Sequence, residues 1–161
     1  MAARSLNQLE SSIATGVFGM SVNQQRLLIC DLFIAEKRAF VSPQQPNVLG
    51  LVFGSGFVIN VGPSRYPDLS ATAKNKKTLV HELVHCWQGQ HSPIACSYIF
   101  DSLWHRAIDE DAYDYVVGEP WESYNAEQQA NLVAEWYDNG ALETDNRFPY
   151  VRDYIRRGRF R

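Results

Sequence analysis

The hydrophobic positions in the first third of the chain fall in short runs bounded by turn-forming residues. Residues 26–34 form an apolar, partly β-branched run, which predicts a buried strand. Residues 48–53 and 57–61 are two further runs of this kind, and the Gly-Ser-Gly between them predicts a hairpin. The two prolines within residues 42–47 indicate a turn or loop. We therefore expect this part of the chain to be rich in strands.

Apolar residues at helical spacing predict helices before and after these strands, over residues 5–13, 70–90, 93–104, 124–138 and 150–157. Leu6, Leu9 and Ile13 would share one face of the first helix. Ser123 is expected to cap the helix over 124–138, which Asn139-Gly140 would end. A short strand or extended stretch is expected at 113–117. Strands followed by helices indicate an α+β fold, with residues 1–161 forming a single domain.

The composition is that of a globular protein with a small negative charge. The chain is 45% hydrophobic and 20% charged, so it does not have the composition of a disordered chain. Its net charge of −3 argues against a nucleic-acid partner. No apolar stretch approaches the ~18 residues of a membrane span. Polar residues interrupt the N-terminal segment, so a Sec-type signal peptide is not expected.

The charges are unevenly distributed along the chain. Residues 101–145 hold most of the acidic residues and a single basic one, Arg106. The last ten residues carry five arginines. We expect a solvated acidic face with the basic tail folded back on it, and the alternative is an acidic rim that attracts a cationic substrate.

The three cysteines do not form a disulfide framework or a recognised cysteine zinc motif. Buried free thiols are expected at Cys30, Cys86 and Cys96. A bridge between Cys86 and Cys96 is the alternative.

The candidate metal-binding and catalytic residues lie in the predicted helix around residues 78–88. His81, Glu82 and His85 form the pattern His-Glu-x-x-His, in which the two imidazoles share one helix face and can bind one zinc ion. Glu82 can reach a water on that ion and accept its proton. Trp87-Gln88 is expected to support this helix. The sequence thus predicts Zn²⁺ as cofactor, His81 and His85 as ligands and Glu82 as catalytic base.

A catalytic zinc site needs a third protein ligand, and His91 is one candidate. It stands six residues after His85, as the third ligand does in metzincins. That pattern also needs a glycine where this chain has Gln88, and a methionine downstream of the motif. The only methionines, Met1 and Met20, lie upstream.

The other candidate is a carboxylate on the helix over 124–138. Glu127 lies between Ala126 and Ala130, small residues that would let this helix approach the metal helix closely. In gluzincins the third ligand is such a downstream helical glutamate, followed one turn later by an acid that orients a zinc-bound histidine. Asn131 occupies that later position here. Glu127 is the preferred third ligand, and Glu135 is the alternative on the same helix.

The sequence HELVHCWQ at 81–88, followed by YNAEQQA at 124–130, resembles small bacterial zincin-like metallopeptidases. The resemblance is greatest to the domain appended to some type VI secretion spike (VgrG) proteins and to related toxin effectors. It extends upstream through residues 17–19, 43–46 and 56–60.

This resemblance implies a zincin-like domain in which a small N-terminal β-sheet precedes an active-site helix and further helices. It implies His81, His85 and Glu127 as zinc ligands and Glu82 as the base. It also implies delivery into the periplasm of a rival cell without a Sec signal, and partners such as a secretion spike or a neutralising immunity protein.

Other parts of a peptidase site are less defined by the sequence. Candidates for stabilising the oxyanion are Tyr113, Tyr115, Tyr124 and His105, and no spacing singles one out. Residues 57–61 are a candidate edge strand along which a peptide substrate would pair, since they lead towards the metal helix.

The function expected from these residues is zinc-dependent hydrolysis of a peptide or protein amide bond. The alternative is a catalytically inactive zincin-like binding module with a structural zinc ion. An intact Glu82 argues against that alternative, because a structural site has no use for an acid beside its ligands. A further alternative keeps the chemistry but directs it at a cell-wall peptide.

Overall fold

The structure is a computed structural model that describes residues 2–44, 56–92 and 114–160. Its four-stranded sheet has the order β1-β2-β4-β3. The strands are β1 (Ala3–Arg4), β2 (Leu27–Asp31), β3 (Phe40–Pro43) and β4 (Phe57–Val61). β2 and β4 run parallel, whereas β1 and β3 are antiparallel to their neighbours. The sheet is therefore mixed, and the predicted α+β class is confirmed.

The sheet confirms two predicted strands and corrects two other expectations. β2 lies within the predicted run 26–34, and β4 has the predicted bounds. β4 is nevertheless not an edge strand, because β2 and β3 flank it on its two sides. Among the described strands, β1 and β3 are outermost. β3 falls partly in the segment predicted as a loop, and Pro43 is tolerated at its end because an outermost strand leaves one side unpaired by the described strands. The predicted strand 48–53 lies outside the described residues.

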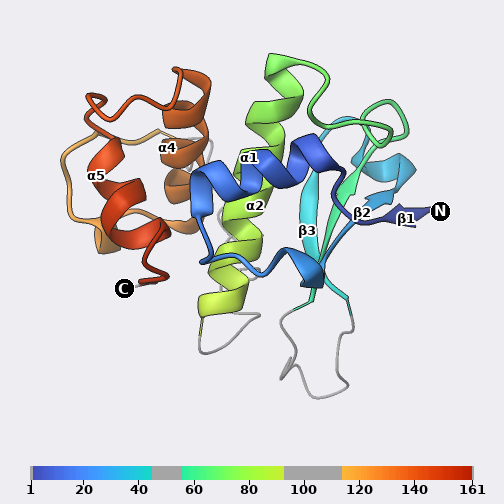
Figure 1. Ribbon diagram of the computed structural model, residues 1–161, viewed down its shortest axis with the longest axis horizontal. Helices are drawn as coiled ribbons and strands as arrows, with labels where there is room; N and C mark the ends of the chain where they lie inside the picture. The colour runs from blue at the N-terminus through green and yellow to red at the C-terminus, as the bar shows by residue number, and fades with distance from the viewer. Residues whose placement is uncertain (1, 45–55, 93–113, 161) are drawn as a thin grey trace.

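Helix α2 runs through the middle of the molecule (Figure 1). The sheet lies on one side of α2, α4 and the C-terminal segment lie on the other, and α1 crosses over it. Their bounds are α1 (Gln8–Phe18), α2 (Ala73–His91), α4 (Ala126–Asp138), α5 (Phe148–Tyr150) and η4 (Val151–Ile155), with short turns at η1 (Gln24–Arg26), η2 (Phe33–Ala35) and η3 (Trp121–Ser123). The predicted helix 93–104 lies outside the described residues.

α1 begins later than predicted because Asn7 and Glu10 form a capping box. The Asn7 side chain accepts a hydrogen bond from the Glu10 amide, and the Glu10 carboxylate accepts one from the Asn7 amide. Leu9 is consequently 64% exposed, so the predicted apolar face is wrong at this residue. The buried face instead includes Ala14, Val17 and Phe18.

α4 is capped by Asn125, not by Ser123 as predicted. Asn125 accepts from the Gln128 amide, and Gln128 reaches back to the Asn125 amide. Ser123 instead lies in the short turn η3. The helix ends as expected at Asn139, and Gly140 follows with a φ of 93°, which favours glycine. The described part of the predicted strand 113–117 is irregular.

The core is formed by the inner face of the sheet, α2 and the helices packed on its other side. Trp87, Trp121 and Trp136 are among its largest fully buried side chains. Cys30 and Cys86 are buried free thiols, as predicted, and Cys96 lies outside the described residues. Within the described ranges, no helix has both the length and the apolar character needed to cross a membrane.

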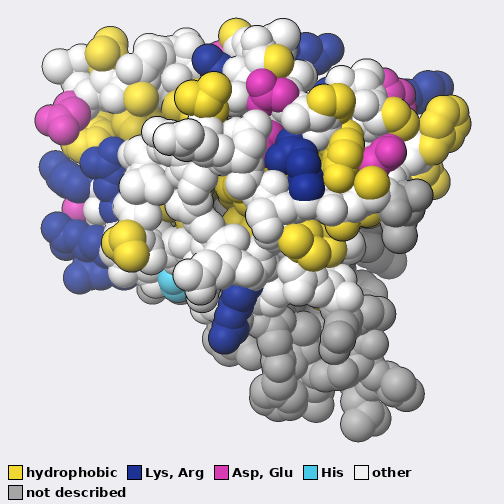
Figure 2. Space-filling view, turned by 45° about the vertical axis from the view of Figure 1, so that its right-hand side comes forward, with side chains coloured by type: hydrophobic (Ala, Val, Ile, Leu, Met, Phe, Trp, Pro, Cys, Tyr) yellow, Lys and Arg dark blue, Asp and Glu magenta, His cyan; other side chains and the backbone are white. Residues whose placement is uncertain are grey.

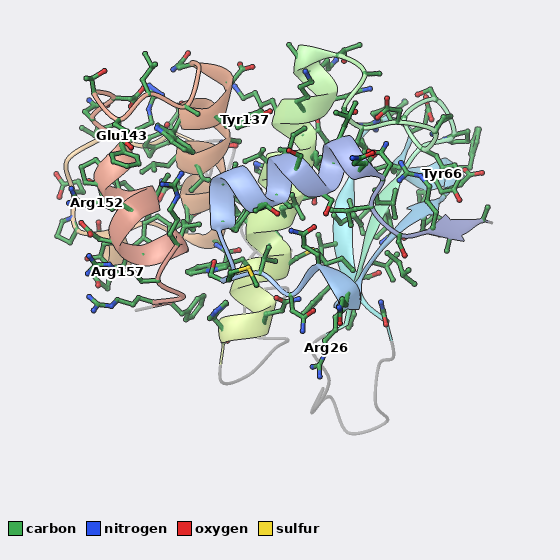
Figure 3. The ribbon with its side chains drawn as sticks, in the orientation of Figure 1. Arg26, Tyr66, Tyr137, Glu143, Arg152 and Arg157 are labelled. Atoms are coloured by element: carbon green, nitrogen blue, oxygen red, sulfur yellow. The ribbon has the colours of Figure 1, made fainter. Side chains whose placement is uncertain are left out.

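The surface carries no large apolar patch on the face in Figure 2, where apolar, basic and acidic side chains are interspersed. In the C-terminal segment, Arg152 and Arg157 lie at the outer edge (Figure 3) and pair with Asp153. Arg156 lies over the rings of Trp136 and Phe148 and donates to main-chain carbonyls of α1. The tail thus folds back onto α1 and α4. Four of the twelve acidic residues within 101–145 lie outside the described residues.

Candidate metal centre

Helix α2 presents His81 and His85 on one face, as their spacing predicts. Thr72 caps the helix by accepting a hydrogen bond from the Asn75 amide. The two imidazole rings meet edge to face, with their centroids 4.9 Å apart. Their Nε2 atoms lie 3.2 Å from each other. Both rings therefore direct the same nitrogen towards one point.

Helix α4 brings Glu127 to the same point from its first turn. One carboxylate oxygen lies 3.2 Å from His81 Nε2 and the other lies 3.4 Å from His85 Nε2. One ligand atom from each of the three residues can be chosen so that all lie within 4.8 Å of one another. Ala130 is fully buried in α4, which fits the predicted close approach of the two helices. The structure thus brings together the three residues that the sequence nominated as ligands.

The spacing of these atoms fits a tetrahedral zinc ion. Donors placed ~2.0–2.1 Å from zinc at tetrahedral angles lie about 3.3–3.4 Å from each other. The two imidazole nitrogens lie 3.2 Å apart, and each faces a different oxygen of the Glu127 carboxylate, at 3.2 Å from His81 and 3.4 Å from His85. Two imidazoles and one carboxylate are also a donor set that zinc uses in catalytic sites. The residues present therefore fit this metal in both chemistry and geometry.

Burial and charge act in opposite directions on the site residues. Burial lowers the pKa of His85, but the contact with Glu127 outweighs burial and leaves this pKa above its usual value. Burial likewise raises the pKa of Glu127, but the two imidazoles hold it below its usual range. Because a metal ion binds only a neutral imidazole, acid pH opposes metal binding at this site.

A buried glutamine, Gln88, orients the His85 ring. The Gln88 amide nitrogen donates to Gln129 Oε1 at 2.9 Å and to the Ala126 carbonyl at 3.1 Å. Its oxygen therefore faces His85 Nδ1, 2.9 Å away, so that this nitrogen is the donor. The remaining lone pair is then on Nε2, the atom directed at Glu127. The sequence had placed Asn131, not Gln88, at the position where gluzincins carry the orienting acid.

Gln129 extends this network into the core. Its amide nitrogen donates to the Trp121 carbonyl at 3.2 Å and to the Tyr124 carbonyl at 3.4 Å. Gln88 and Gln129 therefore connect the metal helix to α4 and to the segment before it. The sequence marked Gln88 only as a support of its helix, and no motif indicated Gln129.

Glu82 lies beside the three clustered residues and lines a cleft. Its side chain is buried, and its Oε2 atom has no hydrogen-bond partner among the residues that the structure describes. The cleft, about 340 Å³ in volume, is lined by His81, Glu82 and Ala134 among others. A carboxylate with this placement can accept a proton from a molecule in the cleft.

The alternative ligands lie elsewhere. His91 Nδ1 is 2.9 Å from the Trp87 carbonyl, and its ring packs on the Trp87 ring. Glu135 accepts a hydrogen bond from Tyr115 and lies 4.0 Å from the Lys77 ammonium group. Neither belongs to the His81–His85–Glu127 cluster.

Two tyrosines nominated for oxyanion stabilisation are occupied away from the cluster. Tyr115 bonds Glu135, and the Tyr124 hydroxyl donates to the Val116 carbonyl at 2.6 Å. Tyr113 and His105 lie outside the described residues.

Comparisons with known proteins relate the chain to a bacterial secretion effector. It is 26% identical over 160 residues to the type VI secretion system spike protein VgrG2b of Pseudomonas aeruginosa, a match covering 93% of the chain but only 15% of that protein. The solved effector domain of Pseudomonas aeruginosa VgrG2b shares its fold, with a TM-score of 0.64 and 24% identity over 92% of this chain and 82% of that one. No protein-family model matches the chain.

Proposed function

We propose that this chain is a zinc-dependent peptidase with a zincin-like, gluzincin-type site. His81, His85 and Glu127 are the proposed zinc ligands, and Glu82 is the proposed general base. The observation that supports this most directly is the convergence of two imidazole nitrogens and one carboxylate within 4.8 Å, with Glu82 next to the first imidazole in the chain. Three protein ligands leave a fourth position open, which is the arrangement of a catalytic zinc site.

The residues of the chain divide the hydrolysis between them. When bound, zinc supplies a Lewis acid that polarises the scissile carbonyl and makes a water more acidic. Glu82 accepts a proton from the attacking water as the new C–O bond forms. It then gives that proton to the leaving nitrogen as the C–N bond breaks. Gln88 keeps His85 in the tautomer that binds metal. Glu127 supplies the negative charge that offsets the ion.

The peptide backbone is proposed to pair with strand β3. β3 is one of the two outermost strands among those that the structure describes, and the residues just before it line the cleft beside His81. An extended peptide can add to such an edge through main-chain hydrogen bonds. This places the substrate strand on β3 instead of on residues 57–61.

The biological setting follows from the relatives. The similarity to the VgrG2b effector domain supports a secreted effector that is delivered to target cells and linked to a secretion spike. Action in the periplasm of the target cell and a neutralising immunity partner remain parts of this proposal. That residues 1–161 form a single domain stays a prediction.

The test of this function is the variant Glu82→Gln, compared with Glu122→Gln. Glu122 is an exposed glutamate outside the cluster, so its variant makes the same chemical change away from the site. We expect Glu82→Gln to keep about one zinc per chain and to lower the cleavage rate by at least ~100-fold, because a general base contributes on that order. Glu122→Gln should match the wild type in both.

Two results would contradict the assignment. A cleavage rate of Glu82→Gln equal to that of the wild type would show that Glu82 is not the general base. A zinc-loaded wild type that cleaves nothing in a mixed peptide library would instead support the inactive binding module.

A further inference from the structure

We propose that the cleft beside the metal centre recognises acidic side chains of the peptide substrate. This inference rests on the proposed peptidase function and names its substrate class. Six charged residues other than histidine line the cleft, and Glu82 is the only acid among them. The other five are basic: Lys37, Arg38, Arg65, Lys74 and Lys77.

The five basic residues come from three separate segments. Lys37 and Arg38 lie between η2 and β3, and Arg65 lies between β4 and α2. Lys74 and Lys77 lie near the start of α2, and His81 follows one helical turn after Lys77. Because residues three or four apart share a helix face, Lys74 and Lys77 form a row that leads to His81.

The charge of the three lysines in the cleft is little neutralised by neighbouring acids. The side chains of Lys37 and Lys74 are exposed and have no ion pair among the described residues. Lys77 lies 4.0 Å from Glu135 and 3.8 Å from Asp138, but all three side chains are about 40% exposed, which makes such contacts weak.

Arg65 is fixed in place by main-chain contacts. Its guanidinium donates to the Ala35 carbonyl at 2.6 Å and to the Glu36 carbonyl at 2.7 Å. These carbonyls are neutral; the Glu36 carboxylate, which accepts from the Ser64 amide, also interacts with Arg65 but does not line the cleft. The cleft therefore has one rigid cation and several adaptable ones.

Neither helix stability nor the overall composition accounts for this cluster. Cations near a helix N-terminus are unfavourable because the helix dipole is positive there, yet the first turn of α2 carries Lys74 and no acid. The chain as a whole has a net charge of −3. A positive cleft on a negative protein concentrates anions at this place.

The ligand that fits this chemistry is a peptide with aspartate or glutamate close to the scissile bond. A volume of about 340 Å³ holds a few side chains, and the same cleft is lined by His81 and Glu82. Carboxylates bound by these lysines would therefore lie near the amide that is cut. The charge distribution along the sequence left open an acidic rim that attracts a cationic substrate. The cleft lining is basic instead, which disfavours a cationic substrate at this place.

The experiment uses the zinc-loaded chain and a mixed peptide library, followed by matched peptide pairs. The library should show aspartate or glutamate enriched at one or more positions around the cut. For each cleaved acidic peptide, a partner with asparagine or glutamine in place of the acids is then measured. We expect kcat/KM for the acidic member to be higher by about tenfold, as two or three ion pairs of modest strength would give.

Charge-reversal variants identify the residues responsible. Lys37→Glu and Lys74→Glu should each lower kcat/KM for the acidic peptide by about two- to fivefold or more and leave the amide peptide nearly unchanged. Lys76→Glu is the control, because Lys76 lies on the same helix but does not line the cleft. Raising the salt from about 0.1 M to about 1 M shortens the Debye length from about 10 Å to about 3 Å and should reduce the preference.

A binding measurement separates this inference from the peptidase proposal. Fluorescently labelled acidic and amide peptides are titrated with the Glu82→Gln variant, and anisotropy reports binding without turnover. Tighter binding of the acidic peptide that is lost in the Lys74→Glu background supports the inference even when no cleavage occurs. Equal binding and equal cleavage of both peptides would overturn it and leave the peptidase proposal intact.

Discussion

Replacing Gln88 by leucine should weaken zinc binding without touching a metal ligand. Gln88 is fully buried and joins His85 Nδ1 to α4 through three hydrogen bonds. Without its oxygen, the His85 ring is free to adopt the tautomer that puts the proton on Nε2. Loss of such an orienting partner typically costs 10–100-fold in metal affinity, about 1.4–2.7 kcal/mol.

The same variant should also destabilise the metal-free fold. Each of the three lost hydrogen bonds is worth ~1 kcal/mol, so the free energy of unfolding should fall by about 3 kcal/mol. Zinc affinity is measured by competition with a chromogenic chelator, and stability by urea unfolding of the metal-free protein. Gln90→Leu is the matched control, because Gln90 lies on the same helix but bonds the Asn23 backbone.

The two effects can be separated. Zinc affinity of Gln88→Leu equal to that of Gln90→Leu, together with a clear loss of stability, would show that Gln88 holds the helices together and does not orient His85. The reasoning about the tautomer would then be wrong.

Two further predictions concern Glu10 and Cys86, neither of which is a proposed metal ligand. The Glu10 carboxylate is bound by Arg4 and by two backbone amides. The variant Glu10→Gln should therefore have a free energy of unfolding about 3 kcal/mol lower than the wild type near pH 7. Burial raises the pKa of Glu10, but Arg4 and the amides bring it below its ordinary value of 4.5. The contribution of Glu10 to stability is therefore present above that pH and is lost as the pH falls through the lowered pKa. The free energies of unfolding of the wild type and of Glu10→Gln, measured by urea titration, should therefore converge in acid. A constant difference between them down to about pH 2 would contradict the assignment. Burial raises the pKa of the Cys86 thiol well above its usual value, so iodoacetamide should label Cys86 at least ~100-fold more slowly in the folded protein than in urea, as peptide mass spectrometry would show. Equal rates would mean that Cys86 is accessible.

The sequence predicted the His81–His85–Glu127 cluster more completely than it predicted the fold. His81 and His85 are four apart in one helix, so local geometry places them together regardless of the rest of the chain. Glu127 was predicted from an acid among small residues, and the close packing of α4 on α2 brings it to the histidines. Gln88 could not be assigned to His85 in this way, because its orientation depends on acceptors that α4 supplies.

The misplaced start of α4 has a physical reason. Several residues can cap a helix, and the residue three positions later decides between them. Ser123 is followed by Ala126, which cannot reach back, whereas Asn125 is followed by Gln128, which does. Checking for this reciprocal partner would have favoured Asn125 from the sequence alone.

The order of the strands required information that the sequence did not carry. β4 lies next to β2 although a helical turn and β3 separate them in the chain. β3 itself has polar Ser42 and terminal Pro43, so it shows neither the alternation nor the composition of a strand. Its pairing with β4, at a register that joins Pro43 to Phe57, stabilises it.

The most direct test of the central claim is a crystal structure of the zinc-loaded chain with data collected at the zinc absorption edge. The account predicts one anomalous peak within ~2.0–2.2 Å of the Nε2 atoms of His81 and His85 and a carboxylate oxygen of Glu127. A protein that takes up no zinc, or a peak bound by His91 or Glu135 with Glu127 turned away, would contradict it.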